Sequence, residues 1–218
     1  LAYEDSAHLP STWNCEKMEV KKGRLACAFF PHHPSHIRVV DDLPHQLRAV
    51  LVRDVHSDTT VLAFRGTIGG ASLETPNWRR NLDCGPISVD GVDVHKGFSE
   101  GVDELLPEII AYLRRHHGPA STLFVTGHSL GGAMATLAAH RLRKRKHVIG
   151  PMVMVSFASP RPGKQDFRSD FQSLFPTGAW RVTRPNDGVT NSPPHAMGFR
   201  HVSREIFFGQ GARLGRTC

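Results

Sequence analysis

Residues Thr122-Leu-Phe-Val-Thr-Gly-His-Ser-Leu-Gly-Gly-Ala133 contain the pattern Gly-x-Ser-x-Gly, with Ser129 at its centre. An apolar, β-rich run precedes the pattern and a helical pattern follows it. A serine presented for attack sits on a sharp strand-to-helix turn, where side chains two positions away would clash, so glycine is needed at both places. The stretch therefore predicts that Ser129 is a nucleophile at such a turn. A plain glycine-rich turn is the alternative.

Short apolar runs and helical patterns alternate on both sides of this stretch. Strands are predicted at residues 49–55, 60–64, 122–126, 153–157 and 180–183. An amphipathic helix is predicted from Phe98 to Leu113, where Pro107 indicates a kink or an early start. A second helix follows Ser129. This alternation predicts an α/β fold of the α/β-hydrolase type, with a mostly parallel central sheet and helices on both faces.

The N-terminal segment shows no clear hydrophobic periodicity, and the number of domains is predicted from length and composition. Residues 1–45 are predicted to form a helix followed by loops, and residues 66–76 a surface loop. A length of 218 residues with 39% hydrophobic content fits a single domain over residues 1–218. No apolar run is long enough for a membrane span, so contact with a membrane would be peripheral at most.

The chain is basic, with a formal net charge of +7 and a pI near 9.6. Its densest basic cluster, residues 141–146, is interpreted as the solvated last turns of a helix, where cations suit the helix dipole; attraction to a lipid surface is the alternative. No zinc-ligand spacing or nucleic-acid signature accompanies the cluster, so we expect neither a metal site nor a nucleic-acid partner.

The four cysteines are Cys15, Cys27, Cys84 and Cys218. They allow two disulfides in three connectivities, which the sequence does not distinguish. The chain opens with Leu1 and shows no hydrophobic signal region, which fits a secreted mature protein. A cytosolic protein with buried thiols is the alternative.

Two further groups are needed for acyl transfer, an oxyanion hole and an acid. The run 61–67 predicts a strand ending at Gly66-Thr67, so the Thr67 amide could join the Leu130 amide as an oxyanion donor. The acid must follow the serine, at the end of a later strand, and Asp187 occupies that position. An ordinary turn is the alternative interpretation of both segments.

These residues together resemble the fungal-type class 3 lipases, a family that includes filamentous-fungal triacylglycerol lipases and a feruloyl esterase. The similarity covers about residues 49–208 and is carried, in order, by Ala63-Phe-Arg-Gly-Thr67, Asn77-Trp78, Val94-His-Lys-Gly-Phe98, Thr126-Gly-His-Ser-Leu-Gly-Gly-Ala133, Ala158-Ser-Pro-Arg161, Asn186-Asp187, Pro193-Pro194, Gly198-Phe-Arg-His201 and Glu205. The resemblance implies Ser129 as nucleophile, Asp187 as acid, Thr67 and Leu130 as oxyanion donors, and a lid at about residues 68–78.

The sequence departs from the family pattern at two places. Asn81 stands where the family usually has an aspartate that supports the oxyanion-hole hydroxyl. The family's catalytic histidine lies near the C-terminus in an Asp-His-aromatic pattern, which this sequence lacks. The base is therefore assigned to His201, with His195 next and a histidine beyond Cys218 as the third alternative. The family resemblance assigns structural roles to His95 and His128, and we expect both to be buried and hydrogen-bonded.

The resulting hypothesis is a serine esterase or lipase that hydrolyses carboxylic esters, most readily acylglycerols, without a cofactor or metal. Ser129 would form an acyl-enzyme that water then resolves. Phospholipase A1 and feruloyl-type esterase are the nearest alternatives. A degenerate lipase-like binding module is the alternative of another class. The expected partners are a lipid or small ester substrate and a lipid interface.

Overall fold

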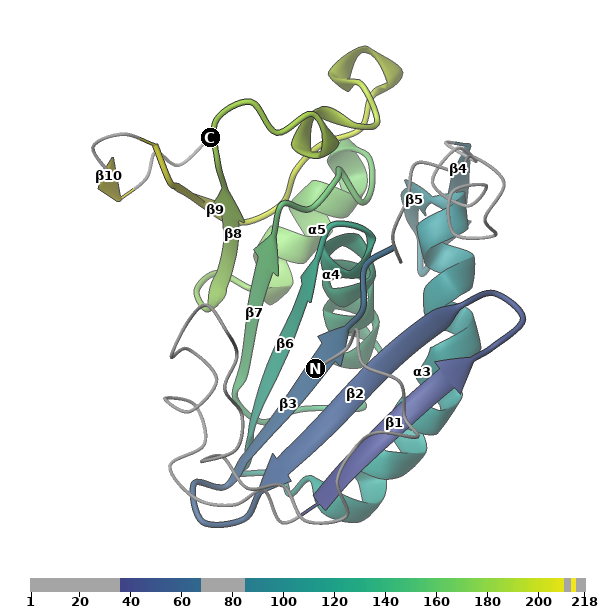
Figure 1. The fold of residues 1–218 in the computed structure, drawn as a ribbon, viewed down its shortest axis with the longest axis vertical. Helices are drawn as coiled ribbons and strands as arrows, with labels where there is room; N and C mark the ends of the chain where they lie inside the picture. Colours follow the sequence, from purple (N-terminus) through teal and green to yellow (C-terminus); the bar gives the residue numbers. More distant parts are fainter. Residues whose placement is uncertain (1–35, 68–84, 210–212, 215–218) are drawn as a thin grey trace.

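The computed structural model describes residues 36–67, 85–209 and 213–214, and its centre is an eight-stranded sheet (Figure 1). The strands lie in the order β1-β2-β3-β6-β7-β8-β9-β10. Their bounds are β1 His36–Asp42, β2 Leu47–Asp54, β3 Thr59–Phe64, β6 Thr122–His128, β7 Met152–Phe157, β8 Ala179–Thr183, β9 Arg204–Phe207 and β10 Arg213–Leu214. The block from β3 to β9 is parallel, whereas β1 and β2 at one edge and β10 at the other are antiparallel. The mostly parallel α/β sheet is confirmed.

The burial of their side chains explains why some strands can be predicted from the sequence and others cannot. In β6 and β7 the side chains alternate between buried and half-buried, and all of β2 is buried, so these strands are visible as apolar runs. The edge strand β1 carries mostly polar side chains that are only partly covered. The predicted helix-then-loop organisation of residues 1–45 is wrong at this point, because residues 36–42 pair with β2 as a strand.

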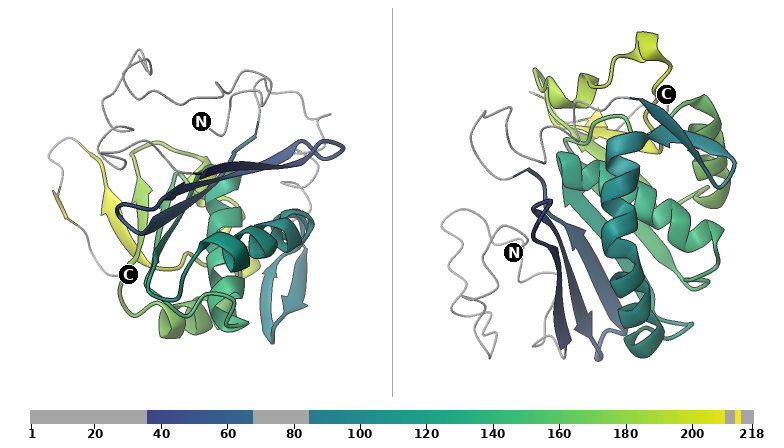
Figure 2. Two further views of the ribbon diagram at one scale, coloured as in Figure 1. Left: turned by 90° about the horizontal axis from the view of Figure 1, so that it is seen from below. Right: turned by 90° about the vertical axis from the view of Figure 1, so that its right-hand side faces the viewer.

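The described α-helices are α3 Lys96–His116, α4 Leu130–Lys144 and α5 Gln165–Leu174. Helices α3 and α4 pack against the sheet and against each other, and α5 packs against α4 and β5. Two short 3-10 helices, η3 Val189–Asn191 and η4 His195–Met197, follow β8. A separate hairpin, β4 Pro86–Val89 with β5 Val92–His95, leads into α3. In Figure 2 the described α-helices lie on one side of the sheet, so the expected second helical layer is not found among the described residues.

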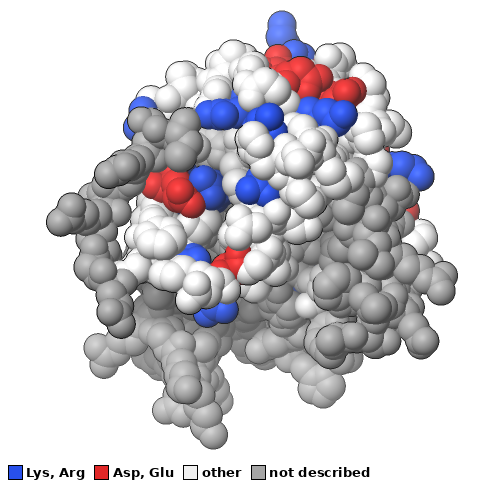
Figure 3. Space-filling model, turned by 90° about the horizontal axis from the view of Figure 1, so that it is seen from above, with Lys and Arg blue, Asp and Glu red and all other residues white. Residues whose placement is uncertain are grey.

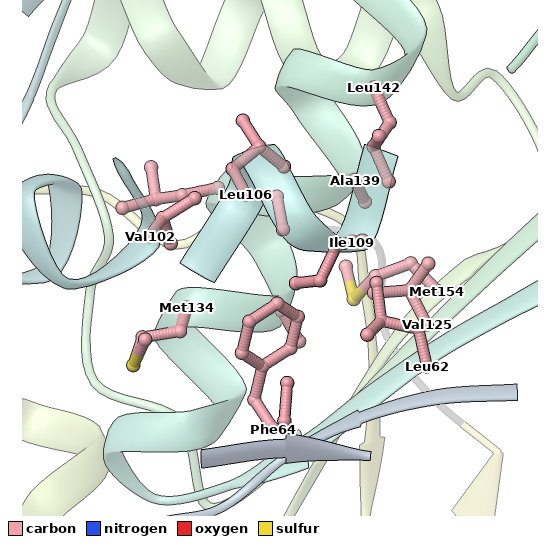
Figure 4. Packing of buried hydrophobic residues seen from close by; sticks show 14 of the residues in the cluster. Leu62, Phe64, Val102, Leu106, Ile109, Val125, Met134, Ala139, Leu142 and Met154 are labelled. Carbon is pink, nitrogen blue, oxygen red and sulfur yellow. The ribbon is translucent and has the colours of Figure 1, made fainter. Parts of the chain in front are cut away.

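One apolar core fills the space between the sheet and these helices (Figure 4). Leu62 and Phe64 from β3 face Ile109 from α3 and Met134 from α4. A smaller cluster of Val50 and Val52 lies apart from this core, with Ile37 and Val39 packed against it. The core fixes α4 against the parallel strands, and with it the turn between β6 and α4.

Helix α3 begins at Lys96, before the predicted Phe98, and continues through Pro107 to His116. Among the described residues no helix combines the length and the apolar character that a membrane crossing requires.

The basic cluster at the end of α4 agrees only in part with the predicted solvated face, because Lys144, Arg145 and Lys146 are exposed but Arg141 is not. Arg141 is buried and its guanidinium donates to the Asp103 carboxylate on α3 at 2.5 Å. Lys144 forms an ion pair with Asp170, and Arg145 forms one with Asp90. The cluster therefore both faces solvent, through residues 144–146, and ties α4 to its neighbours.

Candidate active site

Ser129 lies at the junction of β6 and α4, at the carboxyl end of the parallel strands. Its backbone angles are φ 56° and ψ −126°, a region that a residue with a Cβ rarely adopts. The Ser129 amide donates to the Phe157 carbonyl on β7 at 2.9 Å, and the Ser129 carbonyl accepts from the Gly132 amide at 2.9 Å. Its side chain makes no hydrogen bond within the described part of the chain. The turn thus holds a half-buried serine at a strained backbone position, as a nucleophile requires.

The two glycines of the motif are needed for close packing. A Cβ on Gly127 would lie 2.1 Å from the Gly131 carbonyl oxygen, and a Cβ on Gly131 would lie 2.3 Å from the Phe64 carbonyl oxygen. The second contact presses the start of α4 against the end of β3. The sequence interpretation of this stretch as a sharp strand-to-helix turn is confirmed.

The two predicted oxyanion donors lie on the two segments that this contact brings together. Phe64 on β3 is in register with Gly127 on β6, and Thr67 follows three residues later, half-buried. The Leu130 amide has no acceptor among the described residues. It belongs to the first turn of α4, where amides are free and the helix dipole favours negative charge. The donor roles of Thr67 and Leu130 remain predictions.

Asp187 lies just past the end of β8, as the sequence predicts, and is half-buried. One of its carboxylate oxygens accepts from the Val189 amide at 3.1 Å. The side chain also lines a cavity of about 530 Å³, together with Thr190, His201 and Glu205. The structure therefore gathers the predicted acid and the predicted base around one cavity.

His201 does not reach the nucleophile in this structure. Its Nε2 donates to the Thr190 carbonyl at 2.7 Å, since a carbonyl can only accept, and no hydrogen bond joins its ring to Ser129 or Asp187 within the described residues. Burial, assisted by Arg181 and Arg161, lowers the pKa of His201 to about 3. An imidazole this weakly basic is poorly matched to general-base catalysis near neutral pH.

The other candidate histidines differ in their surroundings. His195 is exposed on η4. His95 is fully buried, caps α3 by accepting from the Phe98 amide at 3.4 Å, and stacks on the Phe98 ring. The structural role expected for His95 is confirmed. The burial expected for His128 is wrong, because that residue is exposed at the end of β6.

Two arginines that sequence reasoning did not assign to the site organise the segment around Asp187. The Arg161 guanidinium donates to the carbonyls of Asn191 and Pro193, and so fixes the segment that carries η3. Arg181 and Thr183 on β8 both donate to the Glu205 carboxylate on β9 at 2.7 Å. Arg161 and Glu205 belong to the motifs quoted above, but their partners are distant in sequence.

Comparison with known proteins agrees with this geometry. Residues 61–197, more than half of the chain, match the family described as Lipase (class 3). The chain belongs to the class 3 lipase family. It is 37% identical to a secreted mono- and diacylglycerol lipase of Fusarium solani, over 69% of this chain and 44% of that protein. It is 32% identical to a lipase of Rhizomucor miehei, over 78% of this chain and 47% of that protein.

Solved structures of lipases share the fold. A triacylglycerol lipase whose catalytic centre is described as a serine protease triad superimposes with a TM-score of 0.64 at 29% identity, over 78% of this chain and 66% of that chain. The chain spans about half the length of the curated relatives it matches. The lid predicted at residues 68–78, Asn81 and all four cysteines lie outside the described residues.

Proposed function

We propose that this class 3 lipase domain hydrolyses carboxylic esters of acylglycerols through an acyl-enzyme on Ser129. The observation that carries the proposal is the strained Ser129 backbone at the start of α4, held there by the two glycine contacts. Strain of this kind persists where a function requires it. The relatives named above include a secreted mono- and diacylglycerol lipase, which supports both the acylglycerol substrate and a secreted location.

The proposed reaction has two stages. The Ser129 hydroxyl attacks the ester carbonyl and its proton passes to an imidazole that Asp187 orients. The amides of Thr67 and Leu130 stabilise the oxyanion of the tetrahedral intermediate, which collapses with loss of the alcohol. Water then attacks the acyl-enzyme by the same route and releases the fatty acid.

The structure bears directly on which histidine can serve as the general base. His201 is neutral at neutral pH, but its Nε2 is committed to Thr190 and its basicity is low. We therefore assign the base to a histidine outside the described residues, and His201 to the support of the Thr190 turn. Histidine-to-asparagine variants at positions 201 and 195 test this assignment. Both are expected to retain esterase activity, whereas loss of activity in a folded His201→Asn protein would restore His201 as the base.

The test of the function itself is hydrolysis of a soluble short-chain ester and of an emulsified diacylglycerol by the purified protein and by Ser129→Ala. We expect the wild-type protein to hydrolyse both, and the variant to lose activity by at least ~10⁴-fold, the scale seen when a nucleophile is removed. Unchanged melting of Ser129→Ala serves as the control for folding. Equal activity of the two proteins would refute the proposal, and inactivity of both would favour a binding module.

A further inference from the structure

Four cationic side chains at the carboxyl end of the sheet have no carboxylate partner within the described residues: Arg161, Lys164, Arg184 and Arg200. Arg161 and Arg200 donate only to backbone carbonyls of the segment 191–199. The side chains of Lys164 and Arg184 make no hydrogen bond or ion pair among the described residues. Their positive charges are therefore not neutralised locally.

Among the acids at this end of the sheet, Glu205 has a cationic partner, whereas Asp93, Asp166 and Asp187 have none among the described residues. Glu205 accepts from Arg181 and Thr183, and Asp166 accepts from the Asp93 amide at 2.7 Å. Asp187 belongs to the proposed catalytic group. The pKa of Arg161 is lowered by burial and by its neighbours Arg181 and Arg200, as crowding of like charges predicts. Since Arg181 and Glu205 cancel, the four unpaired cations exceed the three acids without a cationic partner by one charge among the described residues.

Exposed apolar side chains lie among these cations. Val189 on η3 is 41% exposed and Met197 on η4 is 48% exposed. Phe157, whose carbonyl accepts from the Ser129 amide, is 43% exposed beside the nucleophile. Figure 3 shows this end of the molecule. Lys and Arg atoms are interspersed there with uncharged residues and with some acidic atoms. Apolar tips surrounded by cations suit a surface with an apolar interior and anionic headgroups.

We propose that the segment from η3 to η4, with Lys164 and Arg184 beside it, is a docking face for an anionic lipid surface. The proposal rests on the proposed lipase function, because the face surrounds the same site. Val189 and Met197 enter the headgroup layer, and the cations contact phosphate or carboxylate headgroups. The face then selects anionic over zwitterionic interfaces for the enzyme. Nucleic acid would bind the cations equally well but would gain little from exposed Val189 and Met197.

The test compares two double variants with matched loss of charge, both in the inactive Ser129→Ala protein so that lipid is not consumed. The first is Lys164→Gln with Arg184→Gln, on the docking face. The second is Arg114→Gln with Lys146→Gln, whose exposed side chains lie at the far ends of α3 and α4 and also lack partners among the described residues. Co-sedimentation is measured with phosphatidylcholine vesicles, with and without phosphatidylglycerol.

We expect the docking-face variant to bind phosphatidylglycerol vesicles about 25-fold more weakly, at about fivefold for each of the two cations near an anionic surface. The far-end variant should change binding by less than about twofold, because it changes net charge without changing the face. Val189→Ser with Met197→Ser should weaken binding to anionic vesicles while leaving net charge unaltered. Equal effects of the two charge variants, or binding that ignores phosphatidylglycerol, would overturn the proposal.

Different experimental results would contradict the docking face and the proposed function. Wild-type protein that hydrolyses a soluble ester but shows no preference for anionic vesicles keeps the function and loses the docking face. Protein that fails to hydrolyse any ester but binds phosphatidylglycerol vesicles through Lys164 and Arg184 keeps the docking face and loses the function. Binding of a short DNA duplex as tightly as the anionic vesicles would also overturn the proposal, since it would show attraction to any polyanion.

Discussion

The turn that positions Ser129 depends on close packing at single residues. Gly131 is in contact with the Phe64 carbonyl at the end of β3, and no neighbouring side chain can move aside to make room for a methyl group. The same contact sets the separation of the two proposed oxyanion donors. A substitution at Gly131 should therefore affect both stability and catalysis.

Gly131→Ala is predicted to lower the free energy of unfolding by about 3 kcal/mol, the upper range for overpacking, because backbone must move. Gly188→Ala is the matched control, since a Cβ there meets nothing within 4 Å and the residue has helical angles. Urea unfolding of both variants measures the difference. A Gly131→Ala protein as stable as Gly188→Ala would mean that the turn is looser than described.

The buried neutral imidazole of His201 predicts a pH dependence of stability. Its pKa in the folded protein is about 3, below the value of about 6.5 for a free histidine, so folding disfavours its protonated form. Stability is then fully present above pH ~6.5 and is lost as the pH falls toward 3. Between pH 7 and 5 the wild-type protein should lose about 1–2 kcal/mol more than His201→Gln, after allowance for partial exposure. Parallel stability curves for the two proteins would contradict this burial.

At the element scale, α4 is held to α3 by a buried charge. Arg141 is almost completely buried, and donates to the Asp103 carboxylate and to Ser99. The Asp103 side chain is 54% exposed and can return to water, whereas the guanidinium cannot. The two partners are therefore not equivalent.

Removing the Asp103 carboxylate should destabilise the protein more than replacing the Arg141 cation. Asp103→Ala leaves a buried cation with fewer partners and is expected to reduce the free energy of unfolding by about 2 kcal/mol, less than for a fully buried pair because Asp103 is exposed. Arg141→Met keeps the apolar stem and should reduce it by less than about 1 kcal/mol. Urea unfolding measures both values. The reverse order would show that the ion pair itself stabilises the α3–α4 contact.

The sequence predicts the inner strands and both long helices because their apolar patterns are dictated by burial on the sheet. It does not reveal β1, whose exposed and half-buried side chains are mostly polar, or α5, which buries only Phe167 and Phe171 among polar neighbours. Ser129 is placed by local sequence, since a turn of this kind requires the glycines. The surroundings of Asp187 and His201 depend on contacts between distant segments, so no local pattern encodes them.

At the scale of the whole molecule, the net charge of +7 becomes informative once its distribution is known. Much of the positive charge in α4 is neutralised by partners on neighbouring elements, whereas cations beside the site are not. The sequence cluster at residues 141–146 is thus a less effective lipid contact than its composition suggests.

Raising the ionic strength should weaken binding to phosphatidylglycerol vesicles, because the Debye length falls from about 30 Å at 0.01 M salt to about 3 Å at 1 M. The salt dependence should be shallower for Lys164→Gln with Arg184→Gln than for the wild-type sequence. Co-sedimentation across a salt series measures both slopes. Identical slopes would place the lipid contact elsewhere on the chain.

The proposed reaction requires Ser129 to be an activated nucleophile. Treatment of the purified protein with a fluorophosphonate, followed by peptide mass spectrometry, tests it most directly. We expect one covalent phosphonate adduct on Ser129, and none in Ser129→Ala. An intact, folded protein that leaves Ser129 unmodified, or that carries the adduct on another serine, would contradict the account.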